Sequence, residues 1–176
     1  MPRLNIIGIA GPARAGKTTS AMYLAQILGG YVYGFADPLR KMLRAIGVDM
    51  DTEQIKRLKE TPLALFEKSP REMMQSLGTE WGRNLVHPDL WVRLAHRHFK
   101  RYGAPMVIHD VRFENEAAWI RQHGVIIHLS RPDCQAVNPH SSEAGITKAE
   151  EDYSVVNDDT LELLQVKLLT VVAPPL

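Results

Sequence analysis

A glycine-bounded octapeptide directly after a short apolar run constrains the fold of this 176-residue chain more than any other feature. The run is Leu4–Ala10, and the octapeptide Gly11–Thr18 matches the pattern G-x-x-x-x-G-K-[ST] in full. Glycines let backbone N–H groups close around phosphate oxygens, and a following helix adds its positive end. In such a loop Lys17 reaches the β- and γ-phosphates and the Thr18 hydroxyl ligates Mg²⁺. The pattern therefore predicts a strand, a phosphate-binding loop and a helix over Gly16–Leu28.

Short apolar runs alternate with helical patterns along the rest of the chain. Further strands are predicted at Tyr31–Phe35, Pro105–His109, Val125–Leu129 and Tyr153–Val156. Further helices are predicted at Asp37–Gly47, Thr52–Lys59, Leu90–Tyr102, Ala117–Gln122 and Thr160–Val171, and Ser69 with Glu72 forms a capping-box pattern at the start of another. Parallel strands need crossovers that pack over the sheet. We therefore expect an α/β chain with the P-loop NTPase fold, a five-stranded parallel sheet with helices on both faces.

The composition narrows the class of protein and its partners. The 21 Lys and Arg residues nearly balance the 20 Asp and Glu residues, and a net charge of +1 argues against a large nucleic-acid surface. The single cysteine, Cys134, excludes an internal disulfide framework. The apolar runs are too short to span a bilayer, and no signal pattern precedes the glycine loop. These features predict one domain over residues 1–176, in the cytoplasm and without a membrane partner.

Two acidic residues follow predicted strands, where ligands bind in such folds. Asp110 comes after the strand Pro105–His109, the place where an NTPase holds an acid near its metal. The alternative for Asp110 is a structural helix cap. Asp37 follows the second strand and is a candidate general base or sugar-hydroxyl ligand, and it also fits the N-cap of a helix that starts with Pro38.

Arginines at element boundaries are candidates for phosphate binding, because the guanidinium group pairs bidentately with phosphate oxygens. These boundary arginines are Arg40, Arg71, Arg83, Arg112 and Arg131. Arginines within helical patterns, Arg44 and Arg121 among them, are expected to be surface charges. The stretch after Arg131, to about residue 150, has no clear periodicity and predicts a mobile lid.

The segment Met73–Arg83 combines a helix, a glycine turn, an amide and an aromatic residue. Gln75 is a candidate for reading a base edge, and Trp81 or Trp91 for stacking on that base. The alternative for each tryptophan is burial in a core, which is the commoner fate of such side chains.

Several motifs in colinear order resemble the phage-type deoxynucleoside monophosphate kinases. Besides the phosphate loop they are Arg71–Glu80, Asp110–Glu116, Val125–Pro132, His140–Gly145 and Asn157–Leu164. The resemblance implies transfer of the γ-phosphoryl group of ATP to a deoxynucleoside monophosphate (dNMP), giving the diphosphate. It also implies an acceptor-binding helical region at about residues 37–104, an NMP-kinase-like lid at about 131–150, and the cytoplasm of a phage-infected or lysogenic bacterium. The partners are then ATP and the dNMP, and formation of a homodimer stays open.

The resemblance, together with the patterns above, gives each candidate residue an expected role. The residues expected to bind ATP are Gly11, Ala13, Arg14, Ala15, Gly16, Lys17, Thr18, Thr19 and Asn157, with Asn157 near the adenine base. The residues expected on the acceptor side are Asp37, Arg40, Arg71, Gln75, Arg83, Trp91, Asp110 and Arg112. The expected catalytic residues are Lys17, Asp37, Arg131 and Arg14, and the expected Mg²⁺ ligands are Thr18 and Asp110.

Two other kinase activities remain open at this point. A sister group of phage P-loop kinases phosphorylates the hydroxymethyl group of 5-hydroxymethyluridine in DNA, and DNA would then be the partner. A hydroxyl acceptor benefits from a base such as Asp37, whereas an ionised monophosphate does not. The near-neutral charge favours the nucleotide acceptor, since DNA calls for a basic groove. The remaining alternative is a small-molecule hydroxyl kinase that resembles dephospho-coenzyme A kinase.

Overall fold

The computed structural model describes residues 5–103, 105–132 and 145–172. The chain forms two compact units, the first made of Met1–Gly34 and Leu94–Leu176 and the second of Phe35–Arg93. The second unit overlaps the region predicted to bind the acceptor. Most of the predicted lid and Cys134 lie outside the described residues.

The first unit is built on one sheet of five strands, as the alternating pattern predicts. The strands are β1 (Ile6–Ala10), β2 (Tyr31–Tyr33), β3 (Met106–Ile108), β4 (Gly124–Ser130) and β5 (Tyr153–Val156). Their order is β2-β3-β1-β4-β5, and each neighbouring pair is parallel. The central strand β1 pairs with β3 on one side and β4 on the other, so Ile6 lies between Met106 and Gly124. The predicted parallel sheet is confirmed, and its carboxyl ends meet at one edge.

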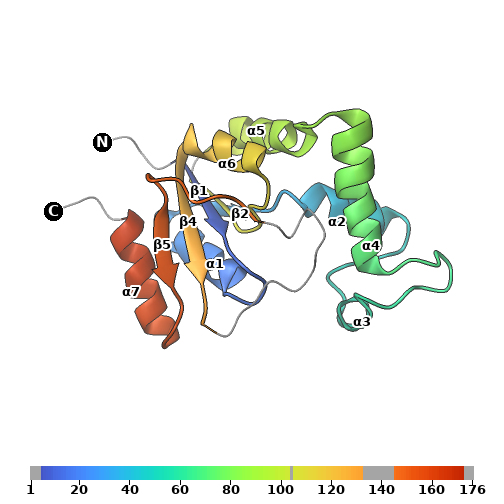
Figure 1. The fold of residues 1–176 in the computed structure, drawn as a ribbon, viewed down its shortest axis with the longest axis horizontal. Helices are drawn as coiled ribbons and strands as arrows, with labels where there is room; N and C mark the ends of the chain where they lie inside the picture. The colour runs from blue at the N-terminus through green and yellow to red at the C-terminus, as the bar shows by residue number, and fades with distance from the viewer. Residues whose placement is uncertain (1–4, 104, 133–144, 173–176) are drawn as a thin grey trace. The chain divides into compact units, whose positions relative to one another are not determined.

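Helices cover both faces of this sheet (Figure 1). On one face α1 (Lys17–Leu28) and α7 (Leu161–Val172) pack against each other and share a core cluster with Ile7 and Ile9 of β1. On the other face the buried Ile120 of α6 (Glu114–Arg121) contacts β1 at Gly8. Because both faces are covered, all five residues of β1 are buried, as expected of a central parallel strand.

The second unit is helical. Its elements are α2 (Asp37–Ala45), α3 (Glu53–Arg57), α4 (Pro70–Gln75) and the π-helix η1 (Ser76–Val86), and it is followed by α5 (Leu90–Tyr102), whose larger part belongs to the first unit. Leu43, Val48 and Met50 form its core cluster. The predicted capping box starts α4, because Ser69 N–H donates to Glu72 Oε2 at 2.8 Å and Glu72 N–H donates to Ser69 Oγ at 3.3 Å.

None of the helices in the described residues has both the length and the apolar character needed to cross a membrane.

Two sequence-based expectations for this unit are wrong. The glycine turn expected within Met73–Arg83 does not form, because α4 continues directly into η1. The π-type spacing is visible where His87 N–H donates to the Gly82 carbonyl five residues earlier. Asp37 is not an N-cap either, since Ala36 holds that position and Asp37 is the first residue of α2.

Candidate phosphate-binding site

The loop between β1 and α1 has the backbone geometry of an anion-binding turn. Three of its residues have positive φ, Gly11 with 142°, Arg14 with 66° and Gly16 with 101°. Helix α1 begins at Lys17, directly after Gly16, so its first N–H groups lack intrahelical partners and face the loop. A phosphate at this helix end would accept from these N–H groups and meet the positive end of the helix dipole. Ala13, Thr18 and Thr19 are exposed on this loop and first turn.

The side chain of Lys17 lies over the same loop. Its Nζ donates to the carbonyl oxygens of Gly11 and Pro12, at 2.6 Å each. The ammonium group therefore stands beside the loop backbone, at the carboxyl end of β1. A positive charge held there is suited to the oxygens of a phosphate at this loop.

The other strands bring further candidates to this edge of the sheet. Asp110 follows β3 after one intervening residue, Arg131 directly follows β4, and Asn157 directly follows β5. Parallel strands place their carboxyl ends together, so these backbone positions share the edge with Gly11. The structure thus brings Gly11–Thr18, Asp110, Arg131 and Asn157 to one edge.

The segment after β3 is shaped by a buried glutamate that sequence reasoning did not identify. Glu116 is 1% exposed, and its Oε2 accepts from the backbone N–H groups of Arg112 at 2.8 Å and Phe113 at 3.1 Å. Helix α6 therefore has Phe113 as its N-cap. The alternative interpretation of Asp110 as a helix cap is wrong, and the metal role stays a prediction.

Asn157 contacts the phosphate loop itself, which the sequence did not indicate. Its Nδ2 donates to the carbonyl oxygen of Ala15 at 2.9 Å, and its backbone N–H donates to the carbonyl oxygen of Ser130 at 2.8 Å. The expected contact with the adenine base stays a prediction.

The acceptor candidates Asp37, Arg40, Arg71, Gln75, Arg83 and Trp91 all belong to the second unit. Arg40 forms an ion pair with Asp51 at 3.3 Å, and Arg71 pairs with Glu60. Among the described residues, Gln75 Nε2 is buried with no hydrogen-bond partner. Trp91 is 2% exposed, and its indole N–H donates to the Gly78 carbonyl at 2.8 Å. Trp91 is therefore buried in the core, which is the alternative to stacking on a base. Trp81, in contrast, is 40% exposed.

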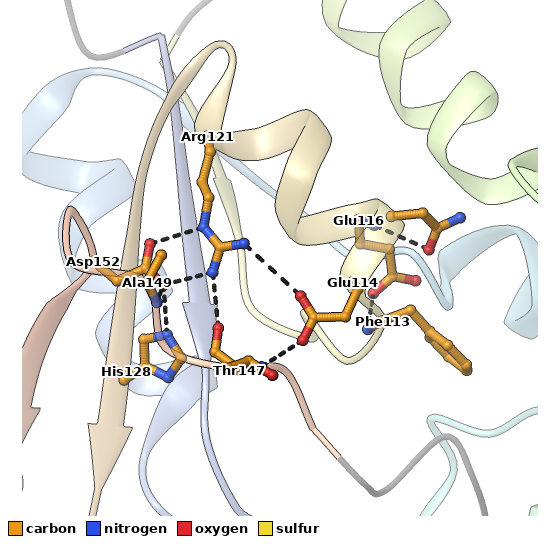
Figure 2. A network of polar contacts seen from close by, with 9 residues as sticks. Phe113, Glu114, Glu116, Arg121, His128, Thr147, Ala149 and Asp152 are labelled. Carbon is orange, nitrogen blue, oxygen red and sulfur yellow. Dashed lines mark hydrogen bonds and ion pairs between the residues drawn. The ribbon is translucent and has the colours of Figure 1, made fainter.

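Sequence reasoning also missed a polar network in the first unit (Figure 2). Arg121 is not a plain surface charge, because its Nε and one terminal nitrogen bind the two carboxylate oxygens of Asp152 at 3.0 and 2.6 Å. His128 of β4 and the Ala149 N–H also contact Asp152 Oδ2, each at 2.9 Å. Burial alone would raise the pKa of Asp152, but these hydrogen bonds outweigh it and lower the pKa to about 2.

The same network also anchors residues 147–152, the segment that precedes β5. Arg121 donates to the Thr147 carbonyl at 2.9 Å, and Thr147 N–H donates to Glu114 at 2.6 Å. The hydrogen bond from Thr147 lowers the pKa of Glu114. Residues 147–152 are thus fixed to α6 and β4, and β5 leads from there to Asn157.

Comparison with known proteins places the chain in a family. The family model described as deoxynucleotide monophosphate kinase matches residues 48–168. This chain is 35% identical to a protein of Acanthamoeba polyphaga mimivirus whose name also refers to a deoxynucleotide monophosphate kinase. The alignment covers 89% of this chain and 90% of the mimivirus protein. The deoxynucleotide monophosphate kinase of Escherichia phage RB69 is 31% identical over 82% of this chain, which spans 55% of that longer protein.

Solved structures of low sequence identity support the fold alone. Dephospho-CoA kinase from Campylobacter jejuni superposes with a TM-score of 0.51 at 14% identity, covering 96% of this chain and 95% of that one. This likeness shows that the two chains share a fold. On the match of its sequence over residues 48–168 and its identity to the viral proteins, this chain belongs to the deoxynucleotide monophosphate kinase family.

Proposed function

We propose that this chain is a deoxynucleoside monophosphate kinase, which transfers the γ-phosphoryl group of ATP to a dNMP and releases ADP and a deoxynucleoside diphosphate. The observation that carries the proposal is the position of Lys17, whose Nζ lies over the Gly11–Thr18 loop at the carboxyl edge of a parallel sheet. Membership of the family supports the choice of acceptor.

The reaction requires positioning and charge neutralisation more than covalent chemistry. The acceptor phosphate is ionised at neutral pH, so its oxygen attacks the γ-phosphorus without a general base. Lys17, the loop N–H groups, Arg14 and Arg131 would stabilise the negative charge on the transferring group. Each of these groups comes from the loop or the same sheet edge.

Thr18 and Asp110 are the residues we propose to hold Mg²⁺, which supplies further charge neutralisation when bound. Thr18 is exposed on the first turn of α1, and Asp110 follows β3 at the same edge. Among the described residues, no three His, Cys, Asp or Glu side chains form a cage for a metal. Such a sparse set fits Mg²⁺, which usually takes one or two protein ligands and completes its shell with phosphates and water.

The second unit would bind the acceptor. Burying the Gln75 Nε2 group without a hydrogen bond among the described residues costs about 1–3 kcal/mol, and Gln75 is the residue we propose to read a base edge. Within this unit, Arg40, Arg71 and Arg83 are the proposed cations for the acceptor phosphate, and Asp37 is a further proposed acceptor-side residue. Trp91 would support this site by packing, given its burial.

A phosphotransfer assay tests the proposal. The protein is incubated with γ-labelled ATP and each of the four standard dNMPs, duplex DNA that contains 5-hydroxymethyluridine, or dephospho-coenzyme A. We expect label in a deoxynucleoside diphosphate. Label that enters only the DNA or only the coenzyme precursor would overturn the assignment.

The position of Asp37 at the start of α2 keeps the DNA hydroxymethyluridine kinase as a second candidate. Asp37→Asn separates the two acceptor chemistries. Turnover with a dNMP should persist in this variant, because an ionised acceptor needs no base, whereas turnover of a hydroxyl acceptor should fall by two orders of magnitude or more.

A further inference from the structure

The backbone of Asn157 is held by the sheet, independently of the contacts of its side chain. It directly follows β5, and its backbone N–H donates to the Ser130 carbonyl at the end of β4 at 2.8 Å. This bond continues the β4–β5 pairing by one residue, from Ser130 opposite Val156 to Asn157. The backbone of Asn157 is thereby held beside the end of β4.

The side chain then reaches the phosphate loop at a single peptide. Its Nδ2 donates to the Ala15 carbonyl at 2.9 Å, across 142 positions of sequence. The next residue, Gly16, has φ 101°, and a Cβ there would lie 2.9 Å from Asn157 Nδ2. The Asn157 amide therefore fills the space beside the Ala15–Gly16 peptide. Position 16 favours glycine because its φ is positive and a Cβ there would crowd this amide.

A peptide unit is planar, so the direction of its C=O group fixes the direction of its N–H group. Because the Ala15 carbonyl points to Asn157, the Gly16 N–H points to the opposite side of the loop. The Gly16 N–H is the last one before α1 and, with the first N–H groups of the helix, belongs to the set that closes around a phosphate. Losing the bond to Asn157 would let this peptide rotate and remove a phosphate donor.

We propose that Asn157 is a positioning residue, which orients the Ala15–Gly16 peptide so that the loop is preformed for the triphosphate of the nucleotide. The role depends on a donor at this position. Aspartate has the same shape but no N–H, and its carboxylate would repel the Ala15 carbonyl. The inference needs the loop to bind a triphosphate, and it does not depend on which acceptor receives the phosphoryl group.

Calorimetric titration with three probes separates this role from a contact with the adenine base. The probes are ATP, GTP and inorganic tripolyphosphate, which has no base. For Asn157→Ala we expect all three dissociation constants to rise by a similar factor of roughly 5 to 10, the value of one neutral hydrogen bond. For Asn157→Asp we expect a larger rise, again equal for the three probes.

The control is Asp159→Asn, a change two residues away that keeps the carbonyl oxygen needed to accept from the Thr160 N–H. Its dissociation constants should equal those of the wild type. Circular dichroism establishes that each variant is folded, and the two Asn157 variants serve as replacements for each other if one is not. Steady-state assays should show a raised KM for ATP with an unchanged KM for the dNMP.

The outcomes are distinct from those of the acceptor assay. A loss confined to ATP, with tripolyphosphate binding as in the wild type, would mean that Asn157 reads the base and would overturn the proposal. Unchanged binding of all three probes would overturn it as well. If no dNMP were phosphorylated yet all three probes bound more weakly, the proposed function would fail while the role of Asn157 stood.

Discussion

Replacing Asp152 with asparagine should reveal how much the polar network of Figure 2 stabilises the first unit. The carboxylate is 1% exposed and accepts hydrogen bonds from Arg121, His128 and the Ala149 N–H. Breaking a buried ion pair costs about 3–5 kcal/mol when the remaining charge has no other partner. Arg121 is 19% exposed and keeps the Thr147 carbonyl, so we expect a cost below this range, about 2–3 kcal/mol.

The pKa of Asp152 gives the expected dependence on pH. Because folding lowers this pKa from 3.8 to about 2, the carboxylate contributes stability above pH 4 and loses it as the pH falls towards 2. A shift of this size corresponds to roughly 2 kcal/mol. The difference in unfolding free energy between the wild type and Asp152→Asn should therefore shrink between pH 5 and pH 3.

Urea denaturation followed by circular dichroism, at pH 7, 5, 4 and 3, measures this difference. The other carboxylates titrate in both proteins, so their contributions cancel. The matched control is Asp158→Asn, which removes the same charge from an exposed pair with Lys167 and should cost much less than Asp152→Asn. A difference for Asp152→Asn that equals this control at pH 7, or that stays constant down to pH 3, would refute the reasoning.

Three further perturbations address the site and the second unit. Lys17→Ala should lower kcat by about 10²- to 10³-fold with little change in the dNMP KM. The control Lys56→Ala, at an exposed pair with Glu53, should leave kcat unchanged. Near-normal turnover of Lys17→Ala would contradict the role of Lys17. Gly82→Ala should destabilise the second unit by about 1–3 kcal/mol, because its Cβ would lie 2.3 Å from a ring carbon of Trp91. Unchanged tryptophan emission and an unchanged melting temperature would argue against that packing. Ser69→Ala removes a capping box and should cost about 1 kcal/mol, seen as faster amide exchange in α4; equal exchange rates would show that the cap is unimportant.

Features that depend on neighbouring residues could be predicted from the sequence. The phosphate loop lies within eight consecutive positions, and each strand is marked by its own apolar run, so the five-stranded parallel sheet followed directly. The limits of α5 and β5 agree with the expected Leu90–Tyr102 and Tyr153–Val156. The capping box of α4 is also a local pattern, and it is present.

Features that depend on distant partners could not be predicted. Arg121 has the spacing of a surface residue, and only the fold brings it to Asp152, 31 positions later. Asn157 and Ala15 are 142 positions apart. The π-helix could not be predicted for another reason. Glycines in a sequence indicate a turn, whereas Gly82 is buried in η1 against the ring of Trp91.

The order of strands in the sheet sets the order in which the chain can fold during its synthesis. Strand β1 is made first, yet both of its neighbours, β3 and β4, come about a hundred residues later. At roughly 5–20 residues per second, a ribosome needs about 5 to 20 seconds to pass from Ala10 to Met106, where β3 begins. Throughout that interval the five apolar residues of β1 have no sheet to join, while the contiguous Phe35–Arg93 is completed early. A nascent chain of this design therefore carries an unpaired apolar strand for more than half of its translation, and that strand is open to aggregation until β3 is made.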